Sequence, residues 1–114
     1  MSALFAGVAV TDLDRAVAWW DRLLPDAETF TPNDTEQVWT LGRDAHVYVV
    51  LRPADAGHAA VTLFVDDLVG FRAAAATRGL VPEHVETYDN GVTKLLYRDP
   101  DGNEVGVGGT GPVD

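Results

Sequence analysis

Apolar residues follow two different periods along this chain, first that of a strand and then that of a helix. Between residues 4 and 10, aliphatic residues alternate with Phe5, Gly7 and Ala9, which is typical of a β-strand with one buried face. From Leu13 to Leu24 the apolar positions recur at the spacing of a helical turn. That spacing predicts an amphipathic helix packed on the strand.

Asp12 and Pro25 mark the two ends of this helix. The Asp12 carboxylate can accept hydrogen bonds from the free amides of the first turn, and a proline cannot continue a helix. Alternating apolar residues then predict strands over residues 27–32, 36–42 and 46–51. The first half of the chain is therefore predicted to have the order βαβββ.

The second half repeats this order. Alternating residues from 58 to 65 predict a strand, and Asp66 or Asp67 is the expected N-cap of a helix that runs to about Arg78, with Gly79 as its C-cap. In three further segments apolar residues alternate with others, and turn-forming residues flank each segment. We predict strands over residues 84–88, 92–98 and 104–108.

Two landmarks recur at the same distance of 55 residues. Val10-Thr11-Asp12-Leu13 corresponds to Val65-Asp66-Asp67-Leu68, and Arg43-Asp44 corresponds to Arg98-Asp99. A repeat of this length, with a strand and a helix in each copy, indicates two similar halves. We predict an α+β fold in which two βαβββ units form a curved mixed sheet around a groove.

The unit boundaries follow from the linker-like residues between the copies. We expect one domain, with a first unit over residues 1–52, a linker at 53–57, a second unit at 58–108 and a loose tail at 109–114. Each helix should cover one face of its sheet, which leaves the other face to line the groove. The residues expected on the groove side are Phe5, Gly7, Ala9, His58, Ala60, Thr62 and Phe64.

The chain has 114 residues and a net charge of −10, from 18 acidic residues against 8 lysines and arginines. This charge argues against nucleic acid and anionic membranes as partners. The acidic residues either keep the surface hydrated or attract a cationic ligand. The chain contains no cysteine, no signal peptide and no apolar run long enough for a membrane span, so we expect a cytoplasmic protein.

Residue types with obvious catalytic chemistry are sparse. Ser2 is the only serine, and no spacing among the three histidines and the carboxylates selects an acid–base pair. The run from Asp99 to Asn103 lacks the ligand spacing of an EF-hand, so we interpret it as a turn. We therefore predict no catalytic residue.

Three segments resemble the vicinal oxygen chelate superfamily, which includes glyoxalase I, extradiol dioxygenases and bleomycin-resistance proteins. The segment from Val10 to Ala16 is similar to the strand-Asp-Leu-helix opening of that superfamily. The aromatic pair and helix end from Trp19 to Leu24, and the turn from Tyr97 to Asn103, are similar to further landmarks of it. The resemblance covers nearly the whole chain and implies two βαβββ units.

The resemblance also implies a divalent metal held by His, Glu or Gln side chains. Three of the four ligand positions fall on Phe5, Ala60 and Gly106, and the fourth falls near Tyr48. Because zinc or iron needs about three or more protein ligands, we predict no metal and no cofactor. A displaced site is an alternative, in which His58 and Glu104 bind the metal together with a third ligand such as His46.

An aromatic groove without a metal suits binding better than catalysis. We expect a small-molecule binding protein that resembles the drug-sequestering bleomycin-resistance proteins, with a cationic or planar ligand, and a homodimer as the resemblance implies. The alternatives are a divergent lyase, isomerase or dioxygenase, and an interaction domain without ligand chemistry. The predicted ligand-binding residues are Phe5, Trp39, Tyr48, His58, Phe64 and Glu104.

Overall fold

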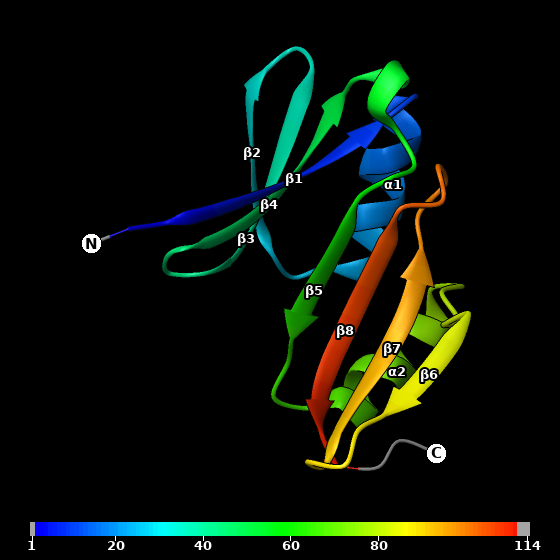
Figure 1. The fold of residues 1–114 in the computed structure, drawn as a ribbon. Helices are drawn as coiled ribbons and strands as arrows, with labels where there is room; N and C mark the ends of the chain where they lie inside the picture. The colour runs from blue at the N-terminus through cyan, green and yellow to red at the C-terminus, as the bar shows by residue number, and fades with distance from the viewer. Residues whose placement is uncertain (1, 112–114) are drawn as a thin grey trace.

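The computed structural model describes residues 2–111 and contains two βαβββ units (Figure 1). The elements of the first unit are β1 (Leu4–Val10), α1 (Leu13–Leu23), β2 (Glu28–Asn33), β3 (Glu36–Gly42) and β4 (Ala45–Leu51). A 3-10 turn, η1 (Pro53–Asp55), lies in the predicted linker. The elements of the second unit are β5 (Ala60–Phe64), α2 (Leu68–Thr77), β6 (His84–Thr87), β7 (Val92–Arg98) and β8 (Glu104–Thr110).

Each unit forms its own four-stranded mixed sheet, with strand order β1-β4-β3-β2 in sheet 1 and β5-β8-β7-β6 in sheet 2. The first and last strands of each unit pair in parallel, and the other pairs are antiparallel. The predicted α+β fold of two βαβββ units is confirmed. The last strand continues to Thr110, two residues into the predicted tail, and residues 112–114 lie outside the described residues.

Both helices begin at the predicted aspartates. One carboxylate oxygen of Asp12 accepts a hydrogen bond from the Arg15 amide at 3.1 Å, and Asp67 accepts one from the Gly70 amide at 3.0 Å. These contacts satisfy amides that have no partner inside the helix. The aspartate that recurs in the two halves of the sequence is therefore the N-cap of the helix in each unit.

The alternation along the first strand of each unit separates core from surface as predicted. Val8 and Val10 are fully buried, whereas the side chains of Phe5 and Phe64 are 50% and 64% exposed. The helix-covered faces of both sheets contribute to one apolar core that also contains Trp20. We call the opposite faces, which carry Phe5 and Phe64, the open faces of sheet 1 and sheet 2.

The turn between β7 and β8 joins the two units. Asn103 is fully buried; its Nδ2 donates to the Ala9 carbonyl oxygen in the first unit at 3.0 Å, and its Oδ1 accepts from the Ala59 amide at 2.9 Å. Asp101 accepts hydrogen bonds from the amide and the hydroxyl of Thr11. The corresponding turn of the first unit, between β3 and β4, is shorter, and the longer turn of the second unit supplies Asp101 and Asn103, which make these contacts.

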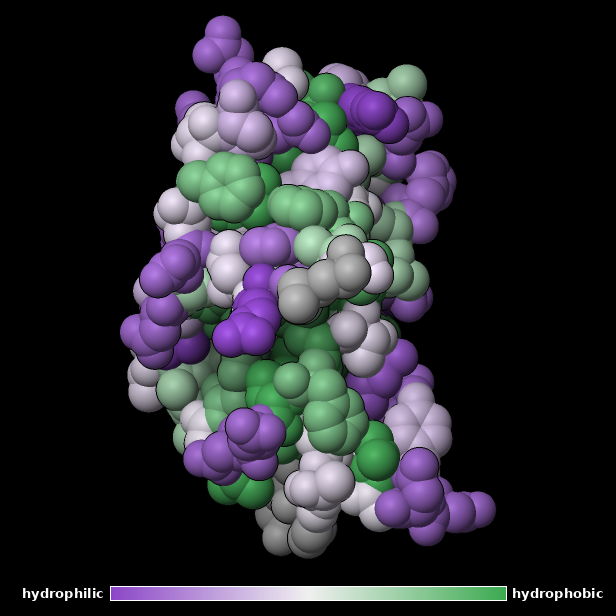
Figure 2. All heavy atoms as spheres, turned by 90° about the vertical axis from the view of Figure 1, so that its left-hand side faces the viewer, coloured by the Kyte–Doolittle hydropathy of each residue, from purple (hydrophilic) through white to green (hydrophobic). Residues whose placement is uncertain are grey.

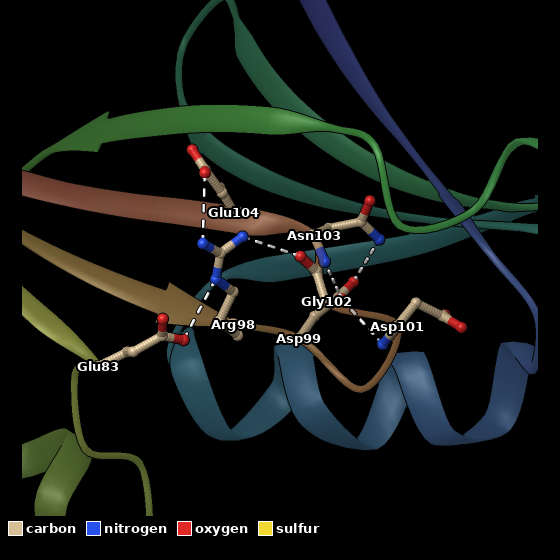
Figure 3. A network of polar contacts seen from close by, with 7 residues as sticks. All are labelled: Glu83, Arg98, Asp99, Asp101, Gly102, Asn103 and Glu104. Atoms are coloured by element: carbon tan, nitrogen blue, oxygen red, sulfur yellow. Dashed lines mark hydrogen bonds and ion pairs between the residues drawn. The ribbon is translucent and has the colours of Figure 1, made fainter.

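Asp99 organises this turn from inside (Figure 3). Its carboxylate accepts from the Asp101 amide, from the Asn103 amide and from Nδ2 of Asn103 at 2.8–3.0 Å. Burial raises the pKa of Asp99, although these donors oppose the shift. The folded protein therefore binds the Asp99 proton more tightly than the unfolded chain, and this group's cost to stability falls as the pH drops through its folded-state pKa.

Candidate functional site

The open face of sheet 1 carries a group of aromatic side chains. The rings of Phe5 and His46 are stacked, with centroids 4.3 Å apart and planes inclined by 16°. They meet because Phe5 and His46 are directly paired in the parallel ladder between β1 and β4. His46 Nδ1 lies 3.1 Å from the Thr40 hydroxyl on β3, which fixes the ring orientation.

Tyr48 lies next to this pair, over the backbone of its ladder partner Gly7. A β-carbon at position 7 would lie 2.6 Å from Cζ of Tyr48, so only glycine leaves room for this ring position. Tyr48, Phe5 and His46 therefore lie on one face of sheet 1 and form an aromatic surface. Aromatic side chains on such a surface can contact a planar ligand.

The open face of sheet 2 has a different floor, because its central strand β8 presents glycines there. Gly106 and Gly108 alternate outward, and the Phe64 ring lies over Gly108 at 3.2 Å from the position of a β-carbon. Lys94 and Thr62 lie over Gly106. This face thus combines an exposed aromatic ring with a hydroxyl and an ammonium group.

The two open faces do not enclose a groove within one chain. Both sheets turn their other faces toward the shared core, so the open faces point outward in different directions (Figure 1). Phe5 and Tyr48 are together on sheet 1, and Phe64 and Glu104 are on sheet 2. The predicted groove between the halves would need both faces, and a single chain supplies them separately.

What lies between the units is an apolar cleft of about 1160 Å³. It is visible in Figure 2 as a hydrophobic hollow between the upper and lower parts of the molecule. It is lined mainly by residues of the core-facing sides, among them Ala6, Leu23, Leu63, Phe71 and Ala74.

The repeat accounts for this cleft. Trp19 and Trp20 of α1 are buried, and the positions 55 residues later in α2 are Ala74 and Ala75. The large side chains that fill the interior beside α1 are therefore absent beside α2. Ala74 lines the cleft and Ala75 is buried in the core, so the smaller side chain at position 74 leaves space beside α2.

Trp39 lies in the core and not on an open face. It is fully buried on β3, its ring is 5.8 Å from that of Trp20, and its Nε1 donates to Asp21 Oδ1 at 3.0 Å. Because a strand alternates its side chains, Trp39 faces α1, whereas Val38 and Thr40 lie on the open face of sheet 1, where Val38 is also buried. Its position assigns it to packing.

His58 and Glu104 lie apart from the aromatic surface. His58 is exposed and precedes β5, and Glu104 is half-buried at the start of β8, 3.4 Å from Arg98 Nη2. Arg98 also pairs with Glu83 at 3.2 Å and donates to the Gly102 carbonyl oxygen (Figure 3). Glu104 thus has a cationic partner.

The residues at the implied metal positions do not fit a metal. Phe5, Ala60 and Gly106 offer no donor atom, and the aliphatic stem of Lys94 occupies the space above Gly106. Within residues 2–111 no three His, Cys, Asp or Glu side chains are grouped closely enough to hold an ion. The displaced arrangement of His46, His58 and Glu104 is not formed in this part of the chain.

The groups with a shifted pKa lie away from the aromatic surface. Burial raises the pKa of the Tyr97 hydroxyl beneath α2. On the edge strand β6, the hydrogen bond from the Tyr88 hydroxyl lowers the pKa of Glu86 and raises that of Tyr88. These shifts follow from local burial and hydrogen bonding.

This architecture is similar to that of proteins with known structures. The structure of a glyoxalase/bleomycin resistance protein from Catenulispora acidiphila is 46% identical, with a TM-score of 0.90 and coverage of 96% of this chain and 99% of that one. No protein-family model and no curated protein matches the chain.

No helix among residues 2–111 is long and apolar enough to cross a membrane.

More distant structures share the fold. A bleomycin resistance determinant encoded on transposon Tn5 is 17% identical, with a TM-score of 0.77 over 96% of this chain and 98% of that one. A lactoylglutathione lyase from Agrobacterium tumefaciens is 21% identical, with a TM-score of 0.75 over 95% and 92%.

The order of elements and the full-length 46% identity together define the class: this chain belongs to the glyoxalase/bleomycin resistance protein/dioxygenase superfamily. The resemblance inferred from the helix opening and the turn after Tyr97 is therefore confirmed.

Proposed function

We propose that this protein binds a flat, drug-like small molecule without a metal, between the open faces of two copies of the chain. The observation that carries this proposal is the exposure of large aromatic side chains on both open faces, above all Phe5 at 50% and Phe64 at 64%. Exposed aromatic groups gathered on one face are typical of binding surfaces. The family includes a protein described as a bleomycin resistance determinant, which agrees with a binding role.

The proposed homodimer follows from the direction of the open faces. One chain offers each face as a single wall, because both sheets pack their other faces into the same core. A two-fold dimer can place the open face of sheet 1 against the open face of sheet 2 of the partner. The two-fold axis then gives two equivalent sites per dimer. Each ligand would then lie between the surface of Phe5, His46 and Tyr48 and the surface of Phe64.

Binding explains the site better than the enzymatic alternative. A lyase, isomerase or dioxygenase of this family's metal-dependent type needs about three donor side chains at one ion. The positions concerned hold Phe5, Ala60 and Gly106. Three of the four positions without a donor atom leave too few ligands for zinc or iron.

We expect the protein purified from medium supplemented with Zn²⁺, Mn²⁺ and Ni²⁺ to carry well below one equivalent of metal. EDTA should leave the thermal midpoint unchanged, because no bound ion contributes to folding. Inductively coupled plasma mass spectrometry and a thermal melt measure both. One equivalent of a divalent metal that is lost in His58→Ala would contradict the metal-free proposal and favour the displaced site.

Planar naphthalene probes test ligand binding directly. We expect the wild-type protein to bind at least one of 2-naphthoate, 2-naphthalenemethanol and 2-naphthylmethylammonium, measured by calorimetry. Phe64→Leu and Phe5→Leu should each weaken binding by about two- to tenfold, because each removes one aromatic contact with the probe. Val81→Ala, which alters an apolar residue that is 72% exposed outside both open faces, should leave binding unchanged.

Light scattering on the same samples reports the oligomeric state. A dimer whose association is weakened by substitutions on both open faces supports the two-copy site. No heat of binding from any probe, with wild-type and variant proteins alike, would contradict small-molecule binding and favour an interaction domain.

A further inference from the structure

We propose that Lys94 makes the open face of sheet 2 a recognition site for an anionic oxygen group, a carboxylate or a phosphate, on the planar ligand. This inference rests on the proposed function and adds the chemical class of the ligand. Lys94 is the only lysine of the chain. It lies on β7, directly opposite Gly108 of β8 and Glu86 of β6.

The side chain of Lys94 lies flat on the sheet. A β-carbon at position 106 would be 2.7 Å from Cε of Lys94, 3.4 Å from its Cδ and 3.1 Å from the Thr62 hydroxyl. The stem therefore extends from β7 across β8, toward the strand that carries Thr62. The ammonium group and this hydroxyl are directed to the same part of the face and can donate to one ligand.

The glycines of β8 permit this arrangement. Any side chain at position 106 would displace the Lys94 stem, and any side chain at position 108 would press on the Phe64 ring at 3.2 Å. Glycine inside a strand weakens it, and often marks a place where another group approaches the backbone closely. The two glycines give Lys94 and Phe64 a common floor, with a cation beside an aromatic ring.

The carboxylates around Lys94 have hydrogen-bond or ion-pair partners of their own. Glu104 on the same face pairs with Arg98, and Glu86 accepts the Tyr88 hydroxyl, while the charge of Lys94 contributes more weakly to the lowered pKa of Glu86. Among residues 2–111 both ion pairs involve Arg98, so Lys94 has no carboxylate within 4.0 Å there. Lys94 is half-buried, and an ammonium that has lost part of its water gains from an anionic acceptor.

The positive charge of Lys94 is opposite in sign to the net charge of the chain. The net charge of −10 favours the approach of cationic ligands, but such long-range attraction is screened by salt. Contact on the open face depends instead on nearby groups, which include Lys94, Thr62 and Phe64. A ligand with a flat apolar body and an anionic oxygen matches all three.

Lys94 also permits a sharp experiment, because ¹³C,¹⁵N-lysine labelling places one labelled side chain in the whole protein. We expect 2-naphthoate or 2-naphthyl phosphate to move the ¹H–¹³Cε signal of Lys94 in a saturable titration. The better of these two anions should bind about tenfold more tightly than 2-naphthalenemethanol, from one charge-assisted hydrogen bond. Comparison of the two anions distinguishes a carboxylate site from a phosphate site.

Lys94→Met keeps the apolar stem over Gly106 and removes the charge. We expect this variant to lose the preference for the anion while its affinity for 2-naphthalenemethanol changes by less than about twofold. Arg15→Met removes one charge from the exposed surface of α1 and should keep the preference. This pair separates recognition by Lys94 from a general effect of net charge.

The outcomes separate this inference from the proposed function. If 2-naphthalenemethanol binds with dependence on Phe5 and Phe64 while the Lys94 signal stays fixed with both anions, the anion site is wrong and the binding function stands. If 2-naphthylmethylammonium binds best in both wild-type and Lys94→Met protein, the anion site is also wrong. If no naphthalene binds but acetate or inorganic phosphate moves the Lys94 signal in saturable fashion, the anion site stands and the planar ligand is wrong.

Discussion

Asn103→Ala is expected to lower the free energy of unfolding by about 3–5 kcal/mol. The substitution removes three hydrogen bonds of a fully buried side chain, those with Ala9, Ala59 and Asp99. It leaves the Ala9 carbonyl oxygen and the Ala59 amide without these partners, at about 1–3 kcal/mol for each such group, and it removes one of the three hydrogen bonds to the buried Asp99 carboxylate. The loss is a large fraction of the stability of a typical domain.

Urea unfolding followed by far-ultraviolet circular dichroism measures this loss. Asn90→Ala is the matched control, because Asn90 is exposed in the hairpin turn and makes one local hydrogen bond to the Val92 amide. We expect the control to lose about 1 kcal/mol or less. Equal losses in the two variants would show that the junction between the units does not depend on Asn103.

Trp39→Ala is expected to lower stability by about 3–5 kcal/mol, and Trp39→Phe by about 1–2 kcal/mol. Trp39 is fully buried against Trp20, so truncation to alanine leaves a cavity in the shared core. Its indole partner Asp21 is exposed and regains water when the hydrogen bond is lost. The cost of the substitution is therefore mainly one of packing.

Phe64→Leu is expected to affect naphthalene binding more than stability, in contrast to Trp39→Phe. We expect Trp39→Phe to reduce stability and leave naphthalene binding unchanged, and Phe64→Leu to reduce binding with a change in stability below about 1 kcal/mol. Unfolding curves and calorimetric titrations of both variants test the pair. A weaker naphthalene affinity in Trp39→Phe, at equal folded fraction, would return Trp39 to the ligand site.

The two predictions concern two kinds of contact that the fold needs. Asn103 holds the second unit to the first through polar groups at one turn, and Trp39 holds α1 on sheet 1 through apolar surface. Neither residue lies on an open face. Changes in the ligand site at Phe5, Phe64 or Lys94 should thus be separable from changes in folding.

Several features followed from the sequence because they depend on neighbouring residues. The alternation of Val8 and Val10 with Phe5 assigned core and surface sides of β1, since successive side chains of a strand point to opposite faces. Asp12, and the pair Asp66 and Asp67, predicted the two helix starts, because capping involves residues about three apart; the structure selects Asp67 for the second helix. The turn from Tyr97 to Asn103 predicted the family.

Other assignments could not be made from the local pattern. Trp39 follows Val38, which is also buried although it lies on the other face of β3, so alternation alone did not show which face Trp39 joins. Lys94 gave no signal at all, because a lysine in a strand is ordinarily a solvated residue. Its significance depends on Gly106 and Gly108. These glycines form no sequence motif with Lys94 and lie next to it only because of the β7–β8 register.

The sequence by itself determined the two βαβββ units, their helix caps and the absence of donors at the implied metal positions. These properties reside in spacing and residue type, which are local. The tertiary structure decided that the open faces point apart, that an apolar cleft lined by Ala74 lies between the units, and that Asn103 joins the halves. Such features depend on how two sheets pack on one core, and contacts across the chain determine that packing.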